Sequence, residues 1–288
     1  MRGVTSITIL GCGYIGKLLA RQLLDKQIAT TGIVHSDASL AECENRDIPC
    51  SLLDLDQQQG EIDLSGHRLI DLAPPPGKGK IDTRITNFLH AIENHAPERF
   101  VLISTTGVYG NCNGEWIDET RPLNPTADRA YRRVDAEQQA QQYCQRHHVP
   151  LVILRVAGIY GPGKTPIARI KSGQPVVSAQ DSPFTNRIHA MDLVYICETA
   201  LLNMDIAGTY NVTDGHPGTM YEYFTGVAGA MNLPAPPEIS LEEARHQLSE
   251  GMLSYMAESR RISNKKLLTD FQIELRYPTL KAGLKAIT

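Results

Sequence analysis

Three glycines near the start of the chain have the spacing of a dinucleotide-binding loop. Gly11, Gly13 and Gly16 follow the apolar run Ile7–Leu10 as a G-x-G-x-x-G pattern, and an amphipathic segment comes next. In such a loop the first glycine permits a tight turn, the second lets backbone N–H groups reach a pyrophosphate, and the third allows close packing of helix and strand. The helix N-terminus adds partial positive charge. We expect Gly11, Gly13, Tyr14, Ile15 and Gly16 to form part of the cofactor-binding site.

A second glycine-rich segment offers an alternative. Gly158–Thr165 fits the G-x-x-x-x-G-K-[ST] phosphate loop of P-loop NTPases and follows an apolar run. Such proteins also need an apolar strand that ends in an aspartate to hold Mg²⁺, and no convincing one follows in the sequence. An NTPase is therefore kept only as the alternative to a dinucleotide-binding protein.

The elements that would position these loops alternate between strand and helix. Short runs rich in Ile, Val and Leu predict buried parallel strands, near residues 6–10, 29–34, 68–73, 99–104 and 150–156. Helical patterns lie between them, at residues 17–26, near 82–95 and near 128–148. This alternation predicts an α/β fold, a doubly wound parallel-sheet Rossmann fold.

The pattern changes after about residue 162. It then predicts helices near 190–203, 219–231 and 240–249 and a strand at 208–212. We expect residues 1–162 to form an NAD(P)-binding Rossmann domain, with returns to its sheet near 185–214. Residues 163–288 would then form mainly a smaller α/β lobe on the substrate side.

The residues after the second strand bear on the choice of dinucleotide. A carboxylate at this point binds the ribose 2′-hydroxyl of NAD, whereas an arginine accepts the 2′-phosphate of NADP. The chain has His35 and Ser36 here, and Asp37 comes one residue late. The missing carboxylate slightly favours NADP, and NAD stays open.

Further motif-like segments are spread in order over most of the chain: Asp54–Leu55, Leu72–Pro74, Ser104–Gly110, Leu154–Gly163, Asn186–Asp192 and Tyr210–Val212. Together they resemble the motifs of one family, the NAD-dependent epimerase/dehydratase family of extended short-chain dehydrogenases/reductases. The loop departs from the family pattern, because Leu10 stands where the earliest glycine is expected.

This resemblance implies an NAD(P)-dependent oxidoreductase or epimerase/dehydratase acting on a sugar nucleotide or another small carbonyl or alcohol substrate. Besides the loop, the implied cofactor contacts are His35, Ser36, Asp54, Leu55, Leu72, Ala73, Pro74, Ser104 and Val156. The implied substrate contacts are Thr106, Tyr109, Gly158, Asn186, Arg187 and His189. The family's asparagine that touches nucleotide-sugar substrates is replaced by Gly158. The resemblance also suggests a homodimer.

Family catalysis uses a Ser or Thr hydroxyl, a tyrosine acid/base and a lysine four residues after the tyrosine. Here Thr105 takes the hydroxyl place and Tyr131 the tyrosine place, but the residue at i+4 is Asp135. A carboxylate there disfavours a phenolate instead of stabilising it. The Tyr-x-x-x-Lys pair is therefore absent.

A shifted alignment does not restore the pair. Matching Glu137 to the family's helix glutamate places Arg133 at the lysine position and Arg129 at the tyrosine position. A catalytically degenerate NAD(P)-binding or sensing protein is therefore a second hypothesis.

Several of these assignments have structural alternatives. Thr105 would also suit the edge of a strand, Tyr131 an amphipathic helix and His189 a buried structural role. Lys78 and Lys80 would either meet an anionic substrate or belong to a solvated turn.

Composition excludes other classes of function. The 288 residues carry a formal charge of −4, and no long basic run indicates nucleic-acid binding. No stretch approaches the roughly 20 apolar residues of a membrane span. The cysteines form no C-x-x-C pair and no zinc-type spacing with histidines, so we expect no metal and reduced thiols in a cytoplasmic protein.

Overall fold

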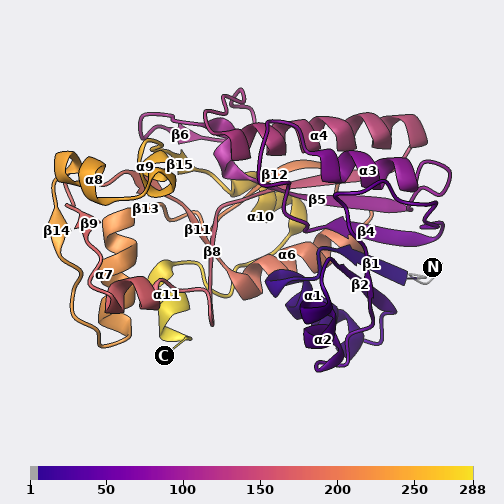
Figure 1. Ribbon diagram of the computed structural model, residues 1–288, viewed down its shortest axis with the longest axis horizontal. Coiled ribbons are helices and arrows are strands. Elements are labelled where there is room, and N and C mark those ends of the chain that lie inside the picture. Colours follow the sequence, from indigo (N-terminus) through magenta and orange to yellow (C-terminus); the bar gives the residue numbers. More distant parts are fainter. Residues whose placement is uncertain (1–5, 288) are drawn as a thin grey trace. The chain divides into compact units, whose positions relative to one another are not determined.

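The computed structural model describes residues 6–287 and contains a seven-stranded sheet (Figure 1). Its strand order is β12-β7-β5-β4-β1-β2-β3. The strands are β1 (Ser6–Leu10), β2 (Thr30–Val34), β3 (Cys50–Leu52), β4 (His67–Asp71), β5 (Arg99–Thr105), β7 (Leu151–Val156) and β12 (Gly208–Val212). The pairs β1–β2, β1–β4, β2–β3 and β4–β5 are parallel. The predicted α/β Rossmann class is confirmed.

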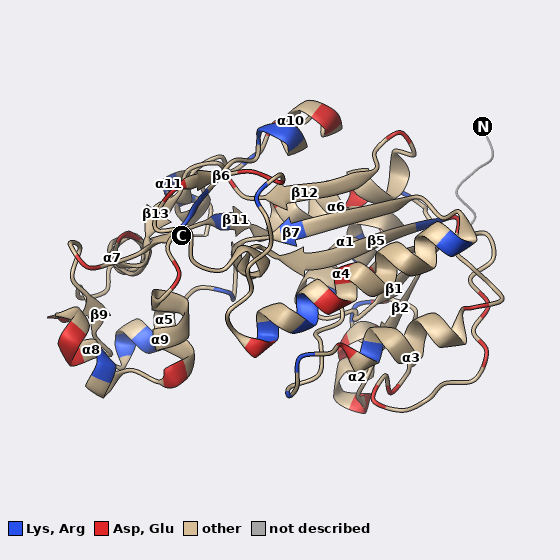
Figure 2. Ribbon diagram, turned by 90° about the horizontal axis from the view of Figure 1, so that it is seen from above, with Lys and Arg blue, Asp and Glu red and all other residues tan. Residues whose placement is uncertain are grey.

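Helices cover both faces of this sheet. In Figure 1, α3 (Thr83–Ala91) and α4 (Asp128–His147) lie on one side, and α1 (Tyr14–Asp25) and α6 (Ala190–Leu202) on the other. A further helix, α2 (Asp37–Glu44), follows β2. The charged residues of α4 gather in its first half and at its end, whereas the strands are mostly uncharged (Figure 2). This distribution suits buried strands beneath helices that expose one face to solvent.

The core beneath α3 and α4 consists of apolar side chains from strands and helices. Phe88 and Tyr143 from the helices pack there with Leu69 and Phe100 from the strands. The end of α6 is held differently, because the fully buried Arg99 donates to the carbonyl oxygens of Ala200 and Ile206 at 2.5 Å. The bond to Ala200 satisfies a carbonyl that α6 itself leaves unpaired, and the bond to Ile206 fixes the loop that follows the helix. Burial lowers the pKa of Arg99 to about 10.

The chain forms two compact units that are each discontinuous in sequence. Unit 1 contains Met1–Val108, Asp128–Arg155 and Leu193–Tyr210, and unit 2 contains Tyr109–Ala127, Val156–Asp192 and Asn211–Thr288. Most of the seven-stranded sheet belongs to unit 1.

Unit 2 is built from short strand pairs and helices. The pairs are β8 (Gly158–Tyr160) with β11 (Arg187–His189), β6 (Trp116–Ile117) with β15 (Arg261–Ile262), β9 (Val176–Val177) with β14 (Glu238–Ile239), and β10 (Phe184–Thr185) with β13 (Gly218–Thr219). The 3₁₀ turn η1 (Thr106–Tyr109) ends at Tyr109, which is the first residue of unit 2. Its helices are α5 (Ile167–Lys171), α7 (Met220–Ala230), α8 (Leu241–Gln247), α9 (Glu250–Met256), α10 (Lys265–Phe271) and α11 (Leu280–Lys285).

The core of unit 2 joins α7 and α11 to Tyr160 of β8 and Ile170 of α5. Both α7 and α8 begin with a capping box, in which Thr219 or Ser240 bonds the third helical residue and receives a bond in return. Within residues 6–287, no helix combines the length and the apolar character needed to cross a membrane.

Candidate active site

The glycine loop packs directly against the end of β4. Gly11 has φ +80°, and a Cβ at this position would lie 2.5 Å from the backbone nitrogen of Ala73. A Cβ at Gly16 would lie 3.1 Å from the Gly11 oxygen and 3.2 Å from Cγ2 of Ile9. Any larger residue at Gly11 would therefore push the loop away from β4, and one at Gly16 would loosen α1 from β1.

The middle glycine has open space around it. Gly13 is exposed, and the nearest atom to a Cβ placed there is the Gly11 oxygen, 3.9 Å away. Helix α1 begins at the next residue with no side-chain cap and no acidic residue in its first turn. The positive end of α1 thus faces a surface where a ligand's phosphates can approach the backbone.

Of the three residues that follow β2, two are exposed and one, Ser36, caps the next helix. His35 is exposed, and Ser36 caps α2 by accepting a hydrogen bond from the Ser39 backbone at 3.3 Å. Asp37 is exposed in the first turn of α2. At the expected adenine position, Leu55 is buried and Asp54 accepts a bond from the Asp56 backbone at 3.0 Å.

A buried group of charges lies at the end of β4. Asp71 accepts a hydrogen bond from the Ala73 backbone at 2.8 Å, and Arg133 of α4 donates to the Ala73 carbonyl oxygen at 3.0 Å. Burial raises the pKa of Asp71 to about 7, although the charge of Arg133 opposes this effect. The pKa of Asp82 is also raised by burial. Leu72 is half-buried, Ala73 is buried and Pro74 is exposed.

The orientation of α4 is fixed by a buried ion pair. Glu137 accepts hydrogen bonds from Ser104 Oγ at 2.5 Å and from Arg155 Nη2 at 2.7 Å. Residues four apart share a helix face, so Arg133 lies on the same side of α4 as Glu137, toward the sheet. The guanidinium of Arg133 therefore lies beside the end of β4. When Glu137 is aligned with the family's helix glutamate, Arg133 takes the position of the family's lysine.

Tyr131 lies elsewhere on α4 and has a different cationic neighbour. The Nζ atom of Lys80 lies 4.5 Å from the centroid of the Tyr131 ring. The carboxylate of Asp135 accepts bonds from the Asp82 backbone at 2.8 Å and from Gln139 at 2.6 Å, so it ties α4 to the start of α3. Asp135 therefore has a structural role.

The hydroxyl-bearing residues after β5 differ in exposure. Thr105 is half-buried, and its Oγ1 accepts a hydrogen bond from the Gly107 backbone at 3.2 Å. Thr106 is buried. The hydroxyl of Thr105 can still donate a hydrogen bond to an oxygen atom of a ligand.

Two expected substrate residues of unit 2 hold the fold together. The buried Tyr109 donates its hydroxyl hydrogen to Asn211 at 2.8 Å. Asn186 donates to the Arg260 carbonyl oxygen and accepts from the Ile262 backbone, both at 3.0 Å. Its amide is thus used to bind the segment around β15.

Gly158 and Arg187 form a second close pair in unit 2. A Cβ at Gly158 would lie 2.4 Å from Nη1 of Arg187, so the glycine makes room for this guanidinium, which stacks 4.1 Å from the Tyr223 ring centroid. His189 accepts a bond from the Met191 backbone at 3.2 Å and lies 3.9 Å from the Tyr277 ring. Burial lowers the pKa of His189 and favours the neutral ring.

The segment of the alternative phosphate loop consists of one short strand and the turn that follows it. Gly158–Tyr160 is strand β8, Lys164 donates its backbone N–H to Gly161 at 2.9 Å, and the five-residue helix α5 starts only at Ile167. Val156 is the buried last residue of β7.

Sequence reasoning missed the contact of Lys80 with Tyr131 and the buried charge of Asp71. The polar residue at the end of an apolar strand was a signal for Asp71. No local signal identified Lys80 as the neighbour of Tyr131, because they come from different segments.

Comparisons with known proteins identify related sequences and related folds. Residues 83–213 match the model of the NAD dependent epimerase/dehydratase family. A segment of 69 residues is 38% identical to dTDP-D-glucose 4,6-dehydratase of Mus musculus and covers 24% of this chain but only 19% of that protein.

Solved structures resemble the whole chain. A functionally unknown conserved protein from Silicibacter pomeroyi is 28% identical with a TM-score of 0.87, and the match covers 98% of both chains. The UDP-glucuronic acid 4-epimerase of Bacillus cereus, in complex with UDP-glucuronic acid and NAD, has a TM-score of 0.77 at 20% identity. That match covers 98% of this chain and 97% of the epimerase, and shows a shared fold.

Proposed function

We propose that this chain, which belongs to the NAD dependent epimerase/dehydratase family, binds a nicotinamide dinucleotide on its glycine loop and uses it on a sugar nucleotide or another small alcohol or carbonyl substrate. The observation that carries the proposal is the open backbone at Gly13, directly before the uncapped N-terminus of α1. A bound dinucleotide would supply a hydride acceptor or donor.

The residues that would hold this cofactor fit its parts. The loop would take the pyrophosphate, Asp54 and Leu55 the adenine side, and His35 and Ser36 the adenosine ribose. The nicotinamide side would be held by Leu72, Ala73, Pro74, Ser104 and Val156.

The preference between the two dinucleotides follows from the end of β2. A carboxylate at the end of β2 would repel a 2′-phosphate, and this chain has none at that position. We therefore extend the proposal to a preference for NADP(H). The exposed carboxylate of Asp37, one residue further, acts in the opposite direction. Parallel titrations with NADH and NADPH, repeated with Asp37→Asn, measure both contributions. Tighter binding of NADH by the unchanged protein would overturn this preference.

For the chemical step we propose that Thr105 orients the substrate oxygen and Tyr131 transfers the proton. Thr105 has an available hydroxyl hydrogen. Lys80 supplies a positive charge beside Tyr131, where the residue at i+4, Asp135, supplies none. In unit 2, Arg187 beside Gly158 offers a cation for an anionic part of the substrate. Thr106, Tyr109, Asn186 and His189 would shape the surroundings of the substrate.

A second function is favoured by one specific observation. Through Oδ2, Asp135 accepts hydrogen bonds from the Asp82 backbone and from Gln139. In the alignment that Glu137 defines, α4 carries arginines in place of the family's tyrosine and lysine. This arrangement suits a protein that binds the dinucleotide without turnover.

An oxidation assay separates the two functions. NADH and NADPH are each incubated with UDP- and dTDP-linked keto sugars and with small aldehydes, and absorbance of the reduced cofactor is followed. We expect turnover that Thr105→Ala and Tyr131→Phe each reduce at least tenfold, while Tyr195→Phe, which changes an exposed tyrosine of α6, leaves it unchanged. Cofactor binding without turnover supports the second function. Turnover that survives both substitutions would remove Thr105 and Tyr131 from the mechanism.

A further inference from the structure

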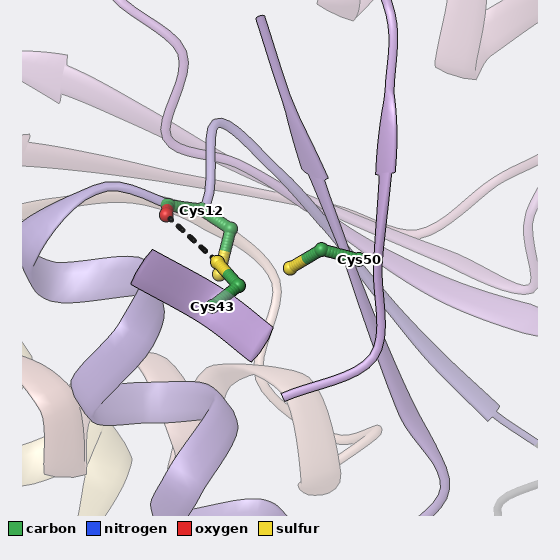
Figure 3. A group of neighbouring side chains, drawn as sticks. All are labelled: Cys12, Cys43 and Cys50. Carbon is green, nitrogen blue, oxygen red and sulfur yellow. Dashed lines mark hydrogen bonds between the residues drawn. The ribbon is translucent and has the colours of Figure 1, made fainter. Parts of the chain in front are cut away.

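Three cysteines from separate elements converge beneath the glycine loop of unit 1. Cys12 lies in the loop between β1 and α1, Cys43 in α2 and Cys50 in β3. Their Sγ atoms all lie within 4.8 Å of one another, and all three thiols are free (Figure 3). The dinucleotide site proposed above makes no use of these sulfur atoms.

A glycine of the neighbouring strand makes room for the cluster. Gly32 pairs with Cys50 across the parallel strands β2 and β3. A Cβ at Gly32 would lie 2.5 Å from Sγ of Cys50 and 2.8 Å from Sγ of Cys12. Even alanine would therefore displace two of the three sulfur atoms.

The cluster is enclosed but has one accessible member. Cys12 and Cys43 have no exposed surface, whereas Cys50 on the edge strand is partly exposed. A small ion can therefore reach the group past Cys50. Three sulfur ligands around one ion, with bonds of about 2.3 Å, stand about 4 Å apart, so the observed spacing needs only a small contraction.

The donor set selects the kind of ion. Within residues 6–287, no histidine, aspartate or glutamate joins the three sulfur atoms. Thiolates alone select soft ions such as Cu(I) and Zn(II). Structural Zn(II) takes four ligands, whereas three sulfur atoms complete a trigonal site for Cu(I).

We propose that Cys12, Cys43 and Cys50 form a trigonal thiolate site for a soft monovalent ion, Cu(I). On binding, each coordinating thiol releases its proton to solvent and forms a bond to copper. Copper stays in the +1 state, so no oxidant or reductant is consumed. The sequence predicts no metal site because these ligands follow no short spacing motif. The inference does not depend on the proposed dinucleotide chemistry.

The test is an anaerobic titration of the reduced, full-length protein with Cu(I) in competition with a chromogenic Cu(I) chelator. We expect one tightly held copper per chain and sulfur-to-copper charge-transfer absorption in the ultraviolet. Cys43→Ser and Cys50→Ser should each weaken binding at least 100-fold. Cys144→Ser, which changes a buried cysteine outside the cluster, should leave binding within threefold.

A second measurement uses the unchanged protein and so does not depend on how the variants fold. Copper loading should protect Cys50, the partly exposed member of the cluster, from alkylation mapped by mass spectrometry. Equal copper retention by the wild type and Cys43→Ser, or protection of other cysteines instead, would overturn the proposal. One zinc ion retained per chain in preference to copper would overturn the choice of Cu(I).

Discussion

Arg133 of α4 donates a hydrogen bond to the carbonyl oxygen of Ala73, 3.0 Å away, and so joins the helix to the backbone that follows β4. Gly11 packs against the same residue, because a Cβ at Gly11 would lie 2.5 Å from the Ala73 nitrogen. Ala73 is thus the point where α4, the glycine loop and β4 meet.

Replacing Arg133 with methionine should lower the free energy of unfolding by about 1–3 kcal/mol, because it leaves the Ala73 carbonyl and the nearby carboxylates without a cationic partner. The loss should be larger at pH 8 than at pH 5, because Asp71, whose pKa is about 7, is protonated at the lower pH. Urea denaturation at both values measures this difference. Arg146→Met, which removes an exposed arginine of the same helix, is the matched control and should cost little. A cost independent of pH would argue against coupling between Arg133 and Asp71.

Asp71 itself should make the protein less stable as pH rises. Its pKa is about 7 in the folded state against an ordinary value of 3.8, so the folded state holds the proton more tightly. Its contribution to stability is therefore complete below about pH 4 and is lost between pH 4 and 7, by at most on the order of 4 kcal/mol. Asp71→Asn should remove this part of the pH dependence. Asp205→Asn, at an exposed position, should not. Parallel stability profiles of wild type and Asp71→Asn would contradict the assignment.

The buried pair of Glu137 and Arg155 should show strong coupling. Removing one partner leaves a buried charge uncompensated, so Glu137→Gln and Arg155→Met should each cost about 3–5 kcal/mol. The double substitution Glu137→Gln with Arg155→Met should cost less than the sum of the two. Thermal and urea unfolding of the four proteins complete the cycle. Additive costs would show that the pair does not fix α4.

The main role of Asn186 should be to stabilise the fold, and any contact with a substrate should be secondary. Asn186→Ala removes bonds to Arg260 and Ile262, so we expect a loss of about 1–3 kcal/mol and faster hydrogen exchange around β15. Asn94→Ala, at an exposed position, serves as the control. Unchanged exchange around β15 together with a raised KM would instead identify Asn186 as a substrate contact.

The strands and most helices of the sheet follow from local patterns in the sequence. The predicted runs at 6–10, 99–104 and 150–156 coincide closely with β1, β5 and β7 because buried parallel strands need continuous apolar residues. Helix α2 was missed, since its eight residues bury only Cys43 and carry no apolar stripe.

The candidate site was less predictable because its contacts join distant segments. The glycine loop has a local signature, which made Gly11, Gly13 and Gly16 recognisable. The orientation of α4 depends instead on Glu137 meeting Arg155, and the thiol cluster depends on the pairing of Gly32 with Cys50. Such pairings are decided by tertiary packing, and the residue spacing along the chain does not reveal them.

The central claim, a dinucleotide held on the glycine loop, is tested most directly by calorimetric titration of Gly13→Ala with NADH and NADPH. A Cβ at Gly13 has space in the protein but would occupy the surface that the pyrophosphate needs. Gly60→Ala is the matched control, because a Cβ at Gly60 meets no atom within 4 Å. We predict saturable binding by the wild type and the control, and at least tenfold weaker binding by Gly13→Ala with unchanged thermal stability. Equal affinities of all three proteins, or no saturable binding of either dinucleotide to the wild type, would contradict the account.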